Sequence, residues 1–324
     1  MAGTLLEMIG GGGRPFFPLV YRLAGALEQV SAAELERDPG TLTRCLRSAQ
    51  RLFGYRIVSN HFDRALLAEA CGASCGWEAG EKRIAVPLLS SVQEMERFRP
   101  AGWEERGAVP VVLEATRRLL AEFRGSPRVA GVVPGPFLLA RQLAGASFLC
   151  EFRRESAAAE ELVLTCGEVS LGLLKKFCEI RTEVLLLLDA VPAVPGNWGK
   201  ELLADLFRPQ VNVANYFEAP LVMALDGPAD LAVLDSLAEV QVDAVAFLTD
   251  QPAEFFREAA GRVNCPIGVP LSAPALAGEE EALKNRVSWG DSLGREWFFV
   301  TPGEMDPEIP AQQFHNLMKL LTTL

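Results

Sequence analysis

The feature that most constrains the fold is a short apolar run that ends at a carboxylate, in TEVLLLLDAVP (residues 182–192). Five apolar residues lie without a break at positions 184–188, and Asp189 follows them directly. A run this short between polar residues indicates a strand buried on both faces, as in a parallel sheet that is covered by helices. The sequence therefore predicts an α/β fold with a polar group at the carboxyl end of this strand.

Four other predicted strands also end at or just before an acidic residue, namely Asp63, Asp226, Asp250 and Glu304. In barrels of alternating strands and helices, the loops after the carboxyl ends of the strands form the active face. The five acids together predict one acidic floor to a single pocket, in which Asp189 and Asp250 contact substrate or cofactor. The alternative for each acid is ordinary loop and helix-capping chemistry.

Eight segments are predicted as strands, at 15–20, 55–59, 129–133, 183–188, 221–225, 244–248, 267–271 and 297–301. Helical patterns lie between them, at 32–53 with a break at Pro39, 91–98, 110–123, 156–180, 198–207, 229–240, 252–263, 279–287 and 311–321. Strands that alternate with helices form either a doubly wound sheet or a closed barrel, and eight units favour a (β/α)8 TIM barrel. We predict a single domain over residues 1–324, with 73–106 as an insertion after the second strand.

Charge and cysteine content exclude several classes of partner. The formal net charge is −11 and the pI is about 4.9, which disfavours nucleic acid and anionic membranes and leaves a small-molecule substrate. The seven cysteines are scattered and odd in number, and no signal peptide is visible, so we predict reduced thiols in a cytoplasmic protein. No apolar run approaches the roughly 20 residues that span a bilayer.

Four stretches resemble one family, in order along the chain. They are FGYRIVSNHFDRALLAEACG (53–72), GVVPGPFLLARQLAG (131–145), TEVLLLLDA (182–190) and FFVTPGEMDPEIPAQQFHNLMKLL (298–321). They look like the uroporphyrinogen decarboxylase superfamily, which contains the decarboxylase of haem synthesis and corrinoid-linked methyltransferases that move methyl groups between methylcobalamin-type carriers and thiols. The resemblance implies a (β/α)8 barrel, and it permits a homodimer because decarboxylases of the family are dimers.

The decarboxylase's functional residues match this chain in part. Its arginine signature resembles YRLAGA, which keeps Arg22 for substrate binding and has Ala26 at the second arginine. Its catalytic aspartate, nine residues before a glycine, corresponds to Asp63. The tyrosine, serine and histidine of its site correspond to Gln142, Ala190 and Pro302. Because alanine cannot pair with a substrate carboxylate, the comparison disfavours a polycarboxylated porphyrinogen.

The methyltransferase branch binds zinc through a His-x-Cys pair and a later cysteine. These positions correspond here to Ala224, Asp226 and Glu304, so the resemblance implies no zinc site of the usual type. The carboxylates Asp226 and Glu304 are candidates to bind a harder cation through oxygen or to protonate a leaving group. His61, two residues before Asp63, is a candidate general acid or lower axial ligand of a corrinoid cobalt. The alternative for His61 is a hydrogen-bonded structural histidine.

A turn formed by Gly135, Pro136 and Phe137 follows one predicted strand and opens a helix. In the family this turn lines the pocket, which makes the three residues candidates for ligand binding together with Gln142. Glycine permits close approach of a ligand, and proline suits the first turn of a helix.

Three functions are compatible with these patterns. The first is a methyltransferase that moves a methyl group to or from a corrinoid on a partner protein, with Asp63, His61, Asp226 and Glu304 as catalytic residues. The second is uroporphyrinogen decarboxylase, and the third is a non-catalytic barrel that binds a tetrapyrrole or a partner. The methyltransferase is favoured, because two of six decarboxylase positions are retained and the EACG stretch after Asp63 resembles the methyltransferase branch.

Overall fold

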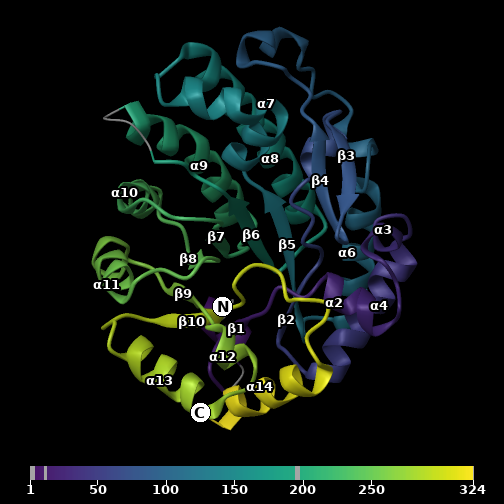
Figure 1. Ribbon diagram of the computed structural model, residues 1–324, viewed down its shortest axis with the longest axis vertical. Coiled ribbons are helices and arrows are strands. Elements are labelled where there is room, and N and C mark those ends of the chain that lie inside the picture. The colour runs from purple at the N-terminus through teal and green to yellow at the C-terminus, as the bar shows by residue number, and fades with distance from the viewer. Residues whose placement is uncertain (1–3, 11–12, 194–197, 324) are drawn as a thin grey trace.

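The computed structural model describes residues 4–10, 13–193 and 198–323 (Figure 1). Its main sheet contains eight parallel strands in the order β1-β10-β9-β8-β7-β6-β5-β2, which form a nearly closed barrel with helices around it. The predicted single-domain (β/α)8 barrel is thereby confirmed. The strands are β1 (Phe16–Phe17), β2 (Ile57–Ser59), β5 (Arg128–Pro134), β6 (Val184–Asp189), β7 (Leu221–Leu225), β8 (Ala244–Phe247), β9 (Ile267–Pro270) and β10 (Trp297–Val300).

The central strands β6 and β7 are buried along their whole length, and Asp189 at the end of β6 is their one polar residue. Every residue of β6 and β7 is buried, and Leu186 pairs with Val222 across them in parallel register. Because helices cover the outside of the barrel and side chains fill its interior, both faces of each strand require apolar residues. This requirement explains why unbroken apolar runs located the barrel strands in the sequence.

The helices lie mainly between successive strands, on the outside of the barrel (Figure 1). The predicted pattern at 32–53 forms two helices, because Pro39 opens a second helix whose first turn is capped by Asp38. Within the described part of the chain, no helix is long and apolar enough to cross a membrane. The helices are α1 (Leu5–Gly10), α2 (Arg22–Leu27), α3 (Ala32–Leu35), α4 (Pro39–Phe53), α5 (Leu66–Ala70), α6 (Val109–Phe123), α7 (Pro136–Phe152), α8 (Ala157–Glu179), α9 (Trp198–Tyr216), α10 (Leu231–Val240), α11 (Ala253–Arg262), α12 (Ala273–Leu276), α13 (Glu280–Asp291) and α14 (Ala311–Thr323), with 3₁₀ helices η1 (Val92–Arg97) and η2 (Trp103–Glu105).

A β-hairpin lies between β2 and β5, and no strand was predicted there. Its strands β3 (Ser74–Glu78) and β4 (Glu81–Val86) pair antiparallel around a two-residue turn. Both turn residues, Ala79 and Gly80, have positive φ, as the right-handed twist of a tight hairpin requires. The hairpin supplies charged side chains to the cavity described next.

Candidate active site

A cavity of about 840 Å³ lies at the carboxyl ends of the barrel strands. Its lining comes from the segments that follow β1, β2, β6, β7 and β10, together with the β3–β4 hairpin and α7. Five carboxylates and five basic side chains line it, so their formal charges cancel. They are Glu36, Asp63, Glu81, Asp226 and Glu304, and Arg22, Arg64, Lys82, Arg83 and Arg141.

At one end of the cavity, the ammonium of Lys82 contacts three carboxylates. Its Nζ lies 2.9 Å from Asp63 Oδ2 and 2.8 Å from Glu69 Oε2, and it also contacts Glu36 Oε2. Burial lowers the pKa of Lys82, but Asp63 and Glu36 more than offset this, so the ammonium stays charged. Burial, and then the charge of Asp63, raise the pKa of Glu36 to about 8. Asp63, the predicted catalytic aspartate, is therefore held in an ion cluster by a lysine of the hairpin.

His61 is fully buried and both of its ring nitrogens are used by the backbone. Nδ1 accepts the N–H of Asp63 at 3.0 Å, so Nε2 carries the proton and donates to the carbonyl oxygen of Val132 at 2.7 Å. Burial lowers the pKa of the imidazole to about 4, which keeps it neutral. This geometry fits the structural alternative, because neither nitrogen is available to a cobalt ion or to a substrate proton.

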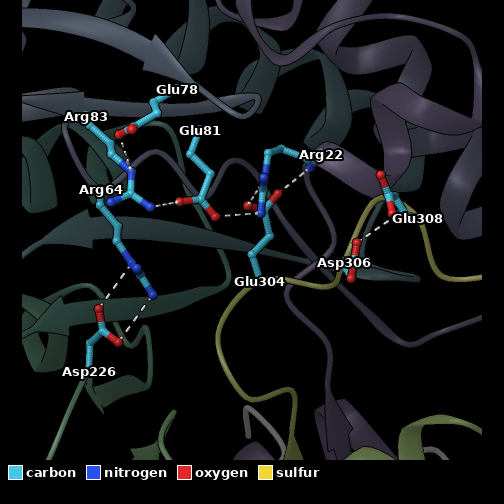
Figure 2. Close-up of polar contacts among 9 residues, drawn as sticks. All are labelled: Arg22, Arg64, Glu78, Glu81, Arg83, Asp226, Glu304, Asp306 and Glu308. Atoms are coloured by element: carbon cyan, nitrogen blue, oxygen red, sulfur yellow. Dashed lines mark hydrogen bonds and ion pairs between the residues drawn. The ribbon is translucent and has the colours of Figure 1, made fainter.

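Arg22 and Glu304 form a second charged group in the cavity (Figure 2). Arg22 Nε donates to Glu304 Oε2 at 2.7 Å, and the backbone N–H of Arg22 contacts the other carboxylate oxygen. The same guanidinium reaches Glu81 on β4, with Nη2 3.1 Å from Oε1. Burial raises the pKa of Glu304, and the contacts with Arg22 oppose that rise. Arg22 is thus already paired with two carboxylates.

Asp226 lies in a separate ion pair with Arg64, as Figure 2 shows. Arg64 Nε is 3.1 Å from Oδ2 and Nη2 is 3.2 Å from Oδ1, which is a bidentate contact. Asp226 and Glu304 both line the cavity, but each is neutralised by its own arginine. The predicted role of this pair as oxygen ligands of a hard cation does not fit that arrangement.

Three other carboxylates, those around Lys82, lie close enough together to resemble a cation site. Oxygens of Glu36, Asp63 and Glu69 fall within 4.8 Å of one another, and the ammonium of Lys82 contacts all three residues. The seven cysteines are free thiols, and among the described residues no cysteine or histidine lines the cavity. The described lining of the cavity therefore supplies no thiolate or imidazole ligand for a zinc ion.

Asp189 turns away from the cavity, contrary to the prediction that it forms part of its floor. It is completely buried, and its carboxylate accepts the N–H groups of Leu138 at 2.7 Å, Ala190 at 2.9 Å and Phe137 at 3.3 Å. These contacts cap the N-terminus of α7, where partial positive charge favours an anion. Burial raises the pKa of Asp189 to about 7, although the three backbone N–H groups lower it.

The turn formed by Gly135, Pro136 and Phe137 leads into the N-terminus of α7, which Asp189 caps, and it does not line the cavity. A Cβ at Gly135 would lie 2.4 Å from Cγ of Asp189, so only glycine fits between the strand end and the helix. Phe137 is buried and packs edge-on against Phe152 at 5.3 Å between ring centroids. The predicted ligand-binding role of the turn is therefore replaced by a structural one.

Of two further predicted site residues, Asp250 and Gln142, only Gln142 lines the cavity. Asp250 lies outside the cavity lining and pairs with Arg286 at 2.7 Å, with about half of its side chain exposed. Gln142 does line the cavity, and its Nε2 donates to the carbonyl oxygen of Arg64 at 3.1 Å. Of the five strand-end acids, Asp63, Asp226 and Glu304 share the cavity, whereas Asp189 and Asp250 do not.

Several cavity residues were missed by sequence reasoning. They include Tyr21 and Glu36, Lys82 and Arg83 on the hairpin, and Arg141 on α7. EKRIAV has three charged residues followed by three apolar ones and lacks the alternation of a half-buried strand, so the sequence carries no local signal that locates β4 and its inward lysine. Nothing local in the sequence indicates the role of Glu36, because its partners come from three other elements.

The fold and the cavity together define a (β/α)8-barrel protein whose candidate site lies at the carboxyl ends of the strands, where such barrels place their active sites. The sequence profile of one family, described as uroporphyrinogen decarboxylase (URO-D), matches residues 22–261. The chain belongs to this family.

Two known proteins to which the chain is similar are methyltransferases. It is 21% identical over 178 residues to the methylcobamide:CoM methyltransferase MtbA of Methanosarcina acetivorans, a match that spans about half of each protein, 52% in both cases. The structure of a methyltransferase from Methanosarcina mazei superposes with a TM-score of 0.79 at 16% identity, and covers 98% of this chain and 97% of that one. The second likeness is evidence for the fold alone.

Proposed function

We propose that the protein is a methyltransferase that moves a methyl group between a small molecule in the barrel cavity and a corrinoid on a partner protein. The observation that carries this proposal is the charge balance of the cavity, where five carboxylates offset five basic side chains. Such a cavity suits a neutral substrate, because an ionic one would have to displace the ion pairs of Arg22, Arg64 or Lys82. Arg141 is the lining base without an ion pair among the described residues. The likeness to a methyltransferase of similar length, over about half of each chain, supports this reaction class.

The residues present define what this chain would contribute. A corrinoid supplies the nucleophilic or methyl-bearing cobalt, and it would arrive as the partner's cargo because His61 has no free ring nitrogen. The Arg22–Glu304 and Arg64–Asp226 pairs would orient the small molecule through hydrogen bonds, with Gln142 beside them. No step in this proposal uses a protein-bound metal. A homodimer and a cytoplasmic location belong to the proposal as well.

Uroporphyrinogen decarboxylation is the second candidate, and it is favoured by the family match and by Arg141, which lines the cavity and has no ion pair among the described residues. A polycarboxylated substrate needs several arginines with free hydrogen-bonding capacity. Here Arg22 is paired with Glu304 and Glu81, and Arg64 is paired with Asp226. Binding such a substrate would bring its carboxylates against those of the protein. The third candidate, a non-catalytic barrel, predicts binding without turnover.

A methyl-transfer assay tests the three candidates. The protein is mixed with cob(I)alamin and a panel of methyl ethers, methylamines and a methylated pterin, and loss of the cob(I)alamin absorption is followed. Uroporphyrinogen is offered in a parallel reaction. We expect methyl transfer that is lost in Asp226→Ala and Glu304→Ala and kept in Asp250→Ala, a strand-end acid outside the cavity. Porphyrinogen turnover without methyl transfer, or neither activity, would refute the proposal.

A further inference from the structure

The Lys82 cluster contains more carboxylates than one ammonium can neutralise. Lys82, Asp63 and Glu36 have side chains that are 5%, 2% and 9% exposed, and the third carboxylate, Glu69, is 32% exposed. With all three acids ionised, the cluster would carry two uncompensated negative charges in a largely buried place. Carboxylates that share one site cannot all ionise readily, so such a group retains a proton at neutral pH.

The hydrogen bonds indicate which carboxyl group holds that proton. Asp63 accepts from both Lys82 Nζ and the N–H of Ala65, at 2.9 Å each, and two donors favour its anion. Glu69 is partly exposed, so water stabilises its anion. Glu36 is buried, lines the cavity and shares the ammonium with two other acids, so its anion is the least stabilised of the three.

The acidic groups around Glu36 also favour its protonated form. Lys82 on β4 is the cation in contact with it, while Asp63 after β2 and Glu69 on α5 repel its anion. Tyr21, before α2, faces the same group of acids: burial raises the pKa of its hydroxyl, and the charges of Glu36, Asp63 and Glu304 raise it further. The pKa of Glu36, about 8, agrees with a carboxyl that is neutral at physiological pH.

A second observation points to a ligand at this place. Tyr21 is 3% exposed and lines the cavity, yet its hydroxyl has no hydrogen-bond partner. A buried hydroxyl without a partner is unfavourable, so a bound molecule that supplies the missing partner gains affinity there. The partnerless hydroxyl and the neutral carboxyl therefore mark one polar subsite within the cavity.

We propose that Glu36 is the general acid of the reaction, and that it protonates the oxygen that departs from a methyl ether while Tyr21 hydrogen-bonds the same atom. The inference rests on the proposed methyl transfer and names its donor class as neutral methyl ethers. An ether oxygen accepts hydrogen bonds and carries no charge, which suits a partnerless hydroxyl beside a carboxyl group that holds its proton.

In a donor R–O–CH₃, the O–CH₃ bond breaks and both of its electrons stay with oxygen. That oxygen takes the proton of Glu36 and leaves as R–OH. The methyl group would pass to the corrinoid carried by the partner protein, whose reduced cobalt would supply the electron pair of the new bond. Glu36 is left as a carboxylate beside Lys82, and it regains a proton from solvent through the open side of the cavity.

Two variants and a donor series test the role of Glu36. We expect Glu36→Gln to lower the rate of methyl-ether cleavage by about a hundredfold or more, and Tyr21→Phe to lower it less. With aryl methyl ethers of increasing phenol acidity, the loss in Glu36→Gln should shrink, because good leaving groups need no proton. Glu258→Gln, an exposed glutamate on α11, is the matched control and should leave the rate unchanged. An equal loss across the donor series would overturn the inference.

Infrared spectroscopy tests the held proton without any turnover. The difference spectrum of wild type minus Glu36→Gln should contain the carbonyl stretch of a protonated carboxyl at about pH 6, and this band should decline as pH rises above about 8. The Asp189 carboxyl, whose pKa is about 7, is present in both proteins and cancels in the difference. Tyr21→Phe should fold with undiminished stability, since it removes a hydroxyl without a partner. Absence of the Glu36 band would overturn the inference whatever the turnover. If the Glu36 band is present but no donor is turned over, the proposed methyl transfer is refuted, and with it the transfer of the Glu36 proton to the departing oxygen.

Discussion

Replacement of Gly135 by alanine tests how the strand-end aspartate and helix α7 fit together. Gly135 has φ −78° and ψ 169°, a conformation that alanine adopts without strain, so the backbone alone predicts a small gain in stability. The added Cβ would nevertheless lie 2.4 to 2.6 Å from Cγ, Cβ and Oδ2 of Asp189. This is about 1 Å closer than ordinary contact, so either β6 or the start of α7 must move.

The cost has two parts. Overpacking of this kind costs about 1–3 kcal/mol. Displacement of the Asp189 carboxylate also weakens its hydrogen bonds to the N–H groups of Leu138 and Phe137, at about 1–3 kcal/mol in total. We therefore expect Gly135→Ala to lower the free energy of unfolding by about 2–6 kcal/mol. Urea unfolding followed by tryptophan fluorescence measures the change.

A matched glycine and a double-mutant cycle sharpen the test. Gly261 in α11 has ordinary φ and open space around it, so Gly261→Ala should stabilise the protein by about 0.5–1 kcal/mol. Asp189→Gly removes the atoms that the new Cβ would meet, and should reduce the cost of Gly135→Ala by at least about 1 kcal/mol. The reasoning is refuted if Gly135→Ala behaves like Gly261→Ala, or if its cost is unchanged without the Asp189 side chain.

Two further predictions concern the charged and titrating groups around the cavity. The pKa of His61 is about 4 when folded, against an ordinary value of 6.5, so the unfolded chain binds more protons between these values. The neutral His61 therefore stabilises the fold above about pH 6.5, and this contribution, on the order of 3 kcal/mol, is lost as pH falls toward 4. Urea unfolding of His61→Gln should lack this dependence of stability on pH. Lys82→Met should destabilise the protein by about 3–5 kcal/mol at pH near 9 and by less at pH near 5, where Glu36 is protonated. Arg262→Met, which breaks the exposed pair with Asp235, should cost less than about 1 kcal/mol at either pH, and equal losses in the two variants would contradict the buried cluster.

The barrel could be predicted from the sequence because its strands carry their own signal. A strand such as β6 is buried on both faces, so its unbroken leucines distinguish it without knowledge of its neighbours. The hairpin gave a weaker signal. Its residues are mostly exposed or half-buried, so the strands carry neither a long apolar run nor a polar-apolar alternation, and the charged residues around Lys82 follow one another directly.

The directions of the strand-end acids could not be predicted in the same way. Asp189 ends β6 in register with Leu225, and Asp226 directly follows Leu225 on the adjacent strand, yet Asp189 caps a helix and Asp226 faces the cavity. The donors that decide this for Asp189 belong to α7, about fifty residues earlier in the chain. Likewise, the pairing of Asp63 with Lys82 depends on how the hairpin folds over the barrel mouth. Such contacts arise from tertiary packing, which residue spacing does not encode.

The measurement that tests the central claim most directly is a single turnover with a ¹³C-labelled methyl donor and cob(I)alamin, using protein from which metals have been stripped. We predict that the label appears bound to cobalt in the ¹³C NMR spectrum and that the reaction is lost in Asp226→Ala, whose Arg64 partner lines the same cavity. Transfer that returns only when zinc is added, or a label that stays on the donor, would contradict a methyltransferase that works without a thiolate metal site.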